Sequence, residues 1–406
     1  MSREDASWRT WLPAALLFLA ILAVGLWYGH LPSARPVLLR PRPTPEPLVP
    51  TPLPASQAQG STDHKPLAVT APVLTPGPTR TPLPGPAAGP SAGIQDRPFW
   101  QGARNARARV GVGVPLGAIG DYDWDGAWPG WYLTWKVMAD PPQPAGTWFA
   151  QMVRLHEGGF RPSLGQITRA AQANPGGLWL IGNEPDVRWQ DNVTPEEYAR
   201  LYETLYRAIK GADPTAQVAI AGVSQPTPLR LAYLDRVLEA YRTMFGQEMP
   251  VDVWNVHAFI LREEQDSWGV GIPPGMSVTR GQLYEIGDHA DMAIFRRQVW
   301  DFRRWMAERG QRERPLIISE YGVLMPASYG FPPELVAGFL VNTFDFFLTA
   351  RDETIGYPAD DNRLVQAFCW YSASDTTYTT SNLFDPVSRA PTAAGELFRQ
   401  YVAMLR

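Results

Sequence analysis

Two glutamates stand at the ends of apolar stretches, where a charged side chain needs a special reason. Glu184 closes the run LWLIGNE at residues 178–184, and Glu320 lies near the end of the run PLIISEYG at residues 315–322. A carboxylate in such a place costs free energy unless it faces a polar cavity. Two carboxylates that meet at one cavity could cleave a glycosidic bond, because one can protonate the leaving oxygen while the other attacks the sugar or activates water. Each glutamate alone would more simply be a surface carboxylate or a helix cap.

The elements that would carry these glutamates alternate along the chain. Eight short β-like runs can be marked, several of them near-continuously apolar, as expected for parallel strands buried on both faces. Helical patterns separate most of them, so the rhythm predicts a (β/α)8 barrel. A doubly wound α/β sheet is the alternative, which periodicity alone does not exclude. The eight runs are residues 107–115, 131–135, 149–155, 178–184, 218–223, 251–259, 315–322 and 365–372.

In a barrel, active sites lie at the carboxyl ends of the strands. Counting the runs places Glu184 after the fourth strand and Glu320 after the seventh. The helix between the fourth and fifth strands has a clear start, since Thr194 can cap it and Glu197 can complete a capping box. We expect this helix to end at Gly211 and another to span residues 294–310.

Composition excludes several classes of function. The chain has 406 residues, a formal net charge of −4 and a single cysteine, Cys369. One cysteine rules out an internal disulfide, a CxxC redox pair and a cysteine zinc cluster, and an acidic chain does not favour nucleic acid as a partner. We expect no metal and no nucleotide cofactor, because neither an HExxH pattern nor a phosphate-binding glycine loop occurs. Aromatic residues make up 12%, with 16 tryptophans, which suits flat, stackable ligands.

The N-terminal part divides into three segments before the barrel. Residues 1–10 form a tail, and residues 11–29 form an uncharged apolar run that is long enough to span a membrane. Since no small-x-small cleavage site follows, we interpret the run as a transmembrane signal anchor rather than a cleaved signal peptide. Residues 30–97 are rich in proline and predict a disordered linker, and residues 98–406 would form the catalytic barrel. The barrel would then be extracytoplasmic and membrane-anchored, or secreted if the apolar run is cleaved.

The motifs around both glutamates resemble those of clan A glycoside hydrolases, the superfamily of retaining glycosidases with catalytic residues on strands 4 and 7. Asn183-Glu184-Pro185 is similar to that clan's acid/base motif, and Ser319-Glu320-Tyr321 is similar to its nucleophile strand. The resemblance covers roughly residues 105–402. Family 128-like glucanases look closest, with families 39 and 5 as competitors, while the loop at residues 120–125 matches no pattern of these families.

The resemblance implies a role for each residue. Glu184 would act as general acid and then base, and Glu320 as the nucleophile that forms a glycosyl-enzyme intermediate. Asn183 would bind the sugar 2-hydroxyl, and His257 would lie near the nucleophile. The further candidates for substrate binding are aromatic: Trp370 as the floor beneath the sugar, Tyr132 and Trp135 as platforms, and Tyr321 next to the nucleophile. For each of them, packing in the barrel is the alternative.

Together these features predict a membrane-tethered, extracytoplasmic retaining glycoside hydrolase that acts on a β-linked polysaccharide or oligosaccharide. The alternative is an inactive carbohydrate-binding or surface-assembly protein on the same barrel. Presence of both glutamates favours the enzyme, because a pure binder needs neither an acid nor a nucleophile. The sugar, the linkage, endo or exo action and the oligomeric state depend on loop shapes and surfaces that the sequence does not specify.

Overall fold

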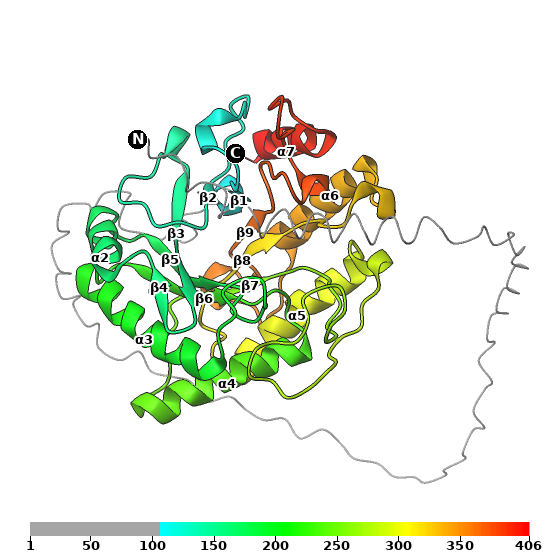
Figure 1. Cartoon of the computed structure of the whole chain (residues 1–406). Helices are drawn as coiled ribbons and strands as arrows, with labels where there is room; N and C mark the ends of the chain where they lie inside the picture. Colours follow the sequence, from blue (N-terminus) through cyan, green and yellow to red (C-terminus); the bar gives the residue numbers. More distant parts are fainter. Residues whose placement is uncertain (1–105, 406) are drawn as a thin grey trace, which may run out of the picture. The chain divides into compact units, whose positions relative to one another are not determined.

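A computed structural model describes residues 106–405, and these form a barrel of parallel strands surrounded by helices (Figure 1). Eight strands follow one another in the order β6-β5-β3-β2-β1-β9-β8-β7, and every neighbouring pair in this order is parallel. A parallel bridge between Ala219 and Val253 joins β6 to β7 and closes the ring. The predicted (β/α)8 barrel is therefore confirmed over the doubly wound sheet, which would have stayed open.

Each of the eight predicted runs coincides with one barrel strand, within a few residues at either end. These are β1 (Val110–Gly113), β2 (Trp131–Leu133), β3 (Trp148–His156), β5 (Leu178–Asn183), β6 (Gln217–Gly222), β7 (Trp254–His257), β8 (Leu316–Tyr321) and β9 (Ala367–Trp370). The sequence pattern did not reveal β4 (Gly159–Arg161), which pairs antiparallel with the end of β3 and lies outside the ring. The fourth barrel strand is thus β5 and the seventh is β8.

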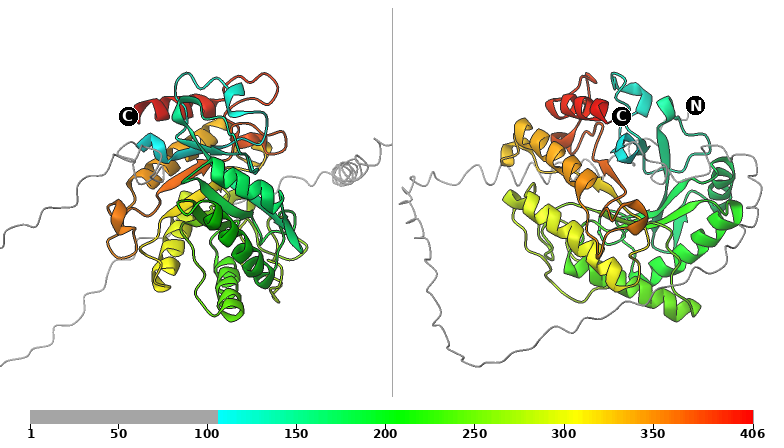
Figure 2. Two further views of the ribbon diagram at one scale, coloured as in Figure 1. Left: turned by 90° about the vertical axis from the view of Figure 1, so that its left-hand side faces the viewer. Right: turned by 180° about the vertical axis from the view of Figure 1, so that it is seen from behind.

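The helices follow one another around the outside of the ring, as Figure 1 and the rear view in Figure 2 show. They are α2 (Leu164–Ala173), α3 (Pro195–Ala212), α4 (Pro228–Phe245), α5 (Met292–Glu308), α6 (Pro333–Thr349) and α7 (Ala393–Met404). Among the described residues, only loops and 3-10 turns connect β1 to β2 and β2 to β3, so the alternation of strand and helix is incomplete there.

The start of α3 was predicted correctly in part. The Thr194 side chain accepts a hydrogen bond from the Glu197 backbone N–H, as a capping residue should. The Glu197 carboxylate, however, accepts from the backbone N–H of Gly158 and pairs with Arg200 instead of closing a capping box. The helix also continues one residue past Gly211.

Side chains on the strands alternate between two cores. One fills the inside of the barrel, and its members include Trp131, Leu180, Ile317 and Cys369. The other lies between the strands and the helices and includes Tyr132, Ile181, Ile318 and Trp370. Because successive side chains of a strand point to opposite faces, a residue's place in this alternation decides whether it can reach a site at the barrel's mouth.

The segments predicted to be anchor and linker, residues 11–29 and 30–97, lie outside the described residues. Within residues 106–405, no helix has the length and apolarity that a membrane span requires.

Candidate active site

A cavity of about 510 Å³ opens where the barrel strands end, and both predicted glutamates line it. Its walls come from loops after several strands, as in barrel enzymes generally. Besides Glu184 and Glu320, its lining includes Trp135, Arg154, Asn183, Val187, Trp189, Gln190, Phe259, Leu261, Val270, Tyr371 and Tyr378. The two carboxylates, 136 positions apart in sequence, therefore share one largely aromatic and apolar cavity.

Glu184 follows β5 directly and adopts an unusual backbone conformation. Its φ is +44°, in the left-handed region, and its backbone N–H donates to the carbonyl of Gly222 on β6 at 3.0 Å. A non-glycine residue in this region typically costs about 1–3 kcal/mol, and such residues cluster at functional sites. The side chain is 8% exposed and lines the cavity.

Glu320 is directed to the cavity by an irregularity in β8. The pairing of β7 with β8 joins Val256 to Ile318 and then His257 to Glu320, so Ser319 is an extra residue in the ladder. A bulge of this kind re-aims the side chains that follow it. Glu320 consequently faces the site, while Tyr321 packs against the helices.

Trp135 fixes one oxygen of Glu320. Its indole Nε1 donates to Oε1 of Glu320 at 2.7 Å. The loop after β2 brings the indole there through a second left-handed residue, since φ of Trp135 is +56°. Its ring also meets that of Tyr371 edge to face, with 5.7 Å between the centroids. Trp135, predicted as a platform, is thus a cavity residue bound directly to the predicted nucleophile.

His257, at the end of β7, contacts both carboxylates. Its Nδ1 lies 3.0 Å from Oε1 of Glu184, and its Nε2 lies 3.5 Å from Oε1 of Glu320. The ring is fully buried and packs against Gly222, where a Cβ atom would lie only 2.3 Å from the ring carbon Cδ2. Any larger residue at position 222 would displace the imidazole, so this glycine makes room for the bridge between the carboxylates.

Burial and neighbouring charges shift the pKa values of Glu320 and His257 upward. Burial raises the pKa of Glu320 to about 7, with a contribution from the charge of Glu184 that His257 opposes. Burial lowers the pKa of His257, but the charges of Glu320 and Glu184 outweigh it, so the pKa is raised overall. Because Glu320 and His257 are in contact, their titration belongs to the pair rather than to either residue alone.

Asn183, the residue before Glu184, lines the cavity and is held by a polar network. Its backbone N–H donates to Asp191 at 2.7 Å, and its side-chain nitrogen donates to Gln190 at 3.3 Å. Asp191 is in turn paired with Arg154, at 2.6 Å between Oδ1 and Nε. Among the described residues, the buried side-chain oxygen of Asn183 has no hydrogen-bond partner.

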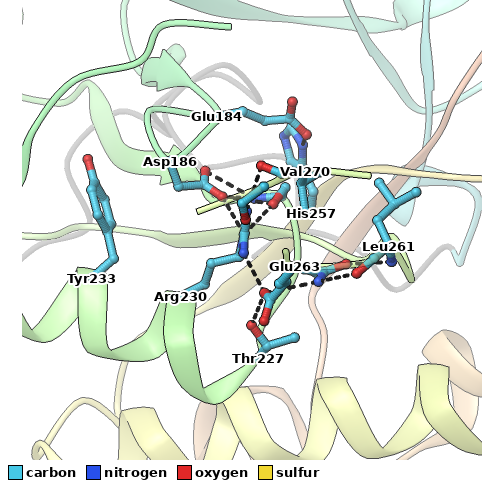
Figure 3. Close-up of polar contacts among 12 residues, drawn as sticks. Glu184, Asp186, Thr227, Arg230, Tyr233, His257, Leu261, Glu263 and Val270 are labelled. Atoms are coloured by element: carbon cyan, nitrogen blue, oxygen red, sulfur yellow. Dashed lines mark hydrogen bonds and ion pairs between the residues drawn. The ribbon is translucent and has the colours of Figure 1, made fainter. Parts of the chain in front are cut away.

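A buried cation supports Glu184 from behind the cavity (Figure 3). Arg230 on α4 donates through Nε to Asp186, two residues beyond Glu184, at 2.7 Å. Its other nitrogens bind Glu263 and the carbonyls of Val270 and Gly271, in the long loop after β7. Arg230, Asp186 and Glu263 are all 0% exposed. Arg230 therefore links the loop that carries Glu184 to the loop after β7, which forms another part of the cavity wall.

Three predicted aromatic residues do not reach the cavity. Tyr132, Tyr321 and Trp370 occupy outward positions of their strands and pack in the core between strands and helices. Tyr132 donates its hydroxyl to the carbonyl of Pro142, and Trp370 donates Nε1 to that of Ser381. The floor predicted at Trp370 is thus wrong, because the alternation along β9 turns that side chain away from the site.

The next residue, Tyr371, lines the cavity in its place, as do Tyr378 and Trp189. Sequence reasoning missed these three and the Arg230 cluster. Tyr371 could have been found at the end of its strand if it had been known which side chains of that strand face the barrel interior. Trp189 could have been found from its position only five residues after Glu184. Nothing in the local sequence distinguishes Arg230 from the other arginines of its helix.

Comparisons with known proteins agree with the motifs. No family profile and no curated protein sequence matches this chain. Among solved structures, a curdlan-specific exo-β-1,3-glucanase of family 128 from Blastomyces gilchristii, in complex with glucose, shares 16% identity at a TM-score of 0.48. The match covers 73% of this chain and 99% of that one. This chain is similar to glycoside hydrolases of family 128.

Two further structures illustrate the range of that family. An endo-β-1,3-glucanase from Amycolatopsis mediterranei, a mutant in complex with laminarihexaose, shares 19% identity at a TM-score of 0.47 and covers 72% of this chain and 99% of its own. An oligosaccharide-binding protein from Trichoderma gamsii shares 12% identity at a TM-score of 0.46, with 76% and 96% covered.

Proposed function

We propose that this protein is a membrane-tethered, extracytoplasmic retaining glycoside hydrolase that cleaves a β-linked polysaccharide. The observation that carries the proposal is the pair of buried carboxylates, Glu184 and Glu320, in contact with one imidazole at a cavity of about 510 Å³. Glycosidic cleavage needs two carboxylates in different protonation states. Glu320, whose pKa is raised to about 7 by burial, supplies the ionised member of the pair at and above that pH.

The roles of the two carboxylates follow from their motifs and surroundings. Glu320 attacks the anomeric carbon and forms a glycosyl-enzyme intermediate. Trp135 holds the carboxylate in place through its hydrogen bond to Oε1. Glu184 protonates the departing oxygen and then removes a proton from the water that hydrolyses the intermediate. His257 contacts both and stabilises negative charge on whichever carboxylate is ionised at each step. The free oxygen of Asn183 accepts a hydrogen bond from a sugar hydroxyl.

A hydrolysis panel followed by proton NMR tests the proposal. β-1,3-glucan comes first in the panel, followed by β-1,4-glucans, mannans and xylans. Wild type should release product with the anomeric configuration of the substrate. Glu320→Ala should abolish turnover, and azide should then yield an α-configured product. Glu184→Ala should spare aryl glycosides, whose good leaving groups need little protonation, and lose activity on polysaccharide. An inverted product, or full activity in either variant, contradicts the assignment.

The tether is a separate part of the proposal and rests on the apolar run at residues 11–29. The full-length protein should stay in the membrane fraction after a high-salt wash. A soluble form that begins between residues 30 and 40 would show that the run is cleaved and the enzyme secreted. Activity of the barrel does not depend on this outcome.

A further inference from the structure

A second cavity of about 600 Å³ adjoins the first. Trp189, Gly269 and Val270 line both cavities, so the two are continuous. The second is lined mainly by the loop after β7, with Arg188 and Trp189 from the loop after β5. A ligand longer than the first cavity could therefore extend from the carboxylates into the second.

Trp189 stands at the junction with most of its indole in solvent. The residue is 76% exposed, the most exposed tryptophan among the described residues. The guanidinium carbon of Arg188 lies 4.7 Å from the centroid of the indole. This cation–π contact fixes the ring and occupies one of its faces. The remaining face is a flat apolar surface of the kind on which a sugar ring can stack.

The other lining groups suit a neutral, hydroxyl-rich ligand. Glu264, Gln265, Asp266 and Ser267 line the second cavity and offer oxygen acceptors for hydroxyl donors. Glu264 is already paired with Arg262 and Arg280. Asp266 and Arg188 add one charge of each sign to the lining, so the cavity selects neither an anionic nor a cationic chain. A neutral polysaccharide offers hydroxyl groups that can donate hydrogen bonds to these oxygens, and it carries no charge that the lining would repel.

The loop that shapes this cavity is held in one conformation. Gly269 has φ +100°, and a Cβ atom there would lie 2.3 Å from the carbonyl oxygen of Arg262. The next two carbonyls, of Val270 and Gly271, accept hydrogen bonds from the buried Arg230. Because this loop is already ordered, it loses little conformational entropy when a ligand binds. The second cavity is therefore organised before any substrate arrives.

We propose that the second cavity is a subsite for the departing, aglycone part of a neutral β-linked polysaccharide, with Trp189 as its stacking platform. This inference rests on the proposed function, because the position of the general acid identifies the side of the scissile bond on which the leaving group lies. Glu184 protonates the leaving oxygen, and Trp189 belongs to the same loop after β5. The departing chain therefore leaves the cleavage point along this loop and toward Trp189.

Two substrates that contain the sugar hydrolysed by wild type distinguish the aglycone side of the site from the glycone side. A 4-nitrophenyl β-trisaccharide places its sugars only on the glycone side, whereas the polysaccharide occupies both sides. For Trp189→Ala we expect kcat/KM on polysaccharide to fall by about tenfold or more, and kcat/KM on the aryl trisaccharide to fall by much less. Trp189→Phe should recover part of the loss, because it keeps a ring. Tyr329→Ala, which removes a 58% exposed ring outside both cavities, is the matched control.

The outcomes distinguish this inference from the proposed function. An equal loss on both substrates, or no loss on polysaccharide, overturns the subsite while the hydrolase stands. If wild type cleaves no member of the panel, binding of the same polysaccharides and of laminarihexaose is measured by calorimetry. Weaker binding by Trp189→Ala than by Tyr329→Ala would then support a sugar site at Trp189 without hydrolysis, and the absence of wild-type binding overturns both.

Discussion

Replacement of Arg230 by methionine should both destabilise the chain and impair catalysis. Methionine keeps much of the volume of the side chain but leaves Asp186 and Glu263, both 0% exposed, without their cation. Loss of one partner from a buried ion pair typically costs 3–5 kcal/mol, because the remaining charge stays buried and uncompensated. A domain is commonly stable by only 5–15 kcal/mol, so this substitution should remove a large share of the free energy of unfolding.

Denaturant unfolding of Arg230→Met and Arg242→Met measures the difference. Both arginines lie on α4, but Arg242 pairs with Glu239 in an exposed i,i+3 contact, and such pairs contribute 0–1 kcal/mol. We also expect kcat on polysaccharide to fall in Arg230→Met at temperatures where the variant is fully folded, because Asp186 no longer anchors the loop of Glu184. Similar unfolding free energies for the two variants, or wild-type kcat in folded Arg230→Met, would refute the reasoning.

Three further predictions concern the carboxylates. Trp135→Phe removes the hydrogen bond that favours ionised Glu320, so its pKa should rise and kcat/KM should fall by roughly ten- to a hundredfold; an unshifted pH profile would contradict this. In wild type, kcat/KM should increase with pH up to about pH 7 as Glu320 ionises, which a flat profile between pH 5 and 8 would disprove. Since the folded-state pKa of Glu320 is raised from 4.5 to about 7, ionisation costs stability as pH rises through that window, on the order of 2–3 kcal/mol. The Tm of Glu320→Gln should therefore exceed that of wild type more at pH 8 than at pH 5.

The positions of the barrel strands were predictable because strands that are buried on both faces have nearly continuous apolar sequences. The two glutamates could be found for the same reason, since each interrupts such a run. Parity within a strand was harder to predict. Trp370 and Tyr371 are adjacent aromatics at the end of β9, and only the pairing of β9 with its neighbours decides that Tyr371 reaches the cavity.

The bulge at Ser319 is a second feature that no local pattern announces. Strict alternation from Ile317, which faces the barrel interior, would turn Glu320 toward the helices and Tyr321 toward the inside. The extra residue reverses this order. The long-range partners of Arg230 were equally hidden, because Asp186 and Glu263 lie 44 and 33 positions away along the chain.

The two carboxylates are held by different means, and this difference fits their proposed tasks. Glu320 belongs to a strand and receives a fixed donor from Trp135, so its position is set by the barrel, and the indole N–H partly offsets the effect of burial, which raises the pKa of the carboxyl. Glu184 lies just beyond its strand, and its loop is anchored through Asp186 by a buried arginine. A nucleophile must stay at one place along the line of attack, whereas an acid that later acts as a base must serve first the leaving oxygen and then water at nearly the same point. Through the loop after β7, the same arginine also shapes the wall on which the departing chain would lie. In the proposed mechanism, one buried side chain, Arg230, therefore positions both the proton donor and the wall that would bind the leaving group.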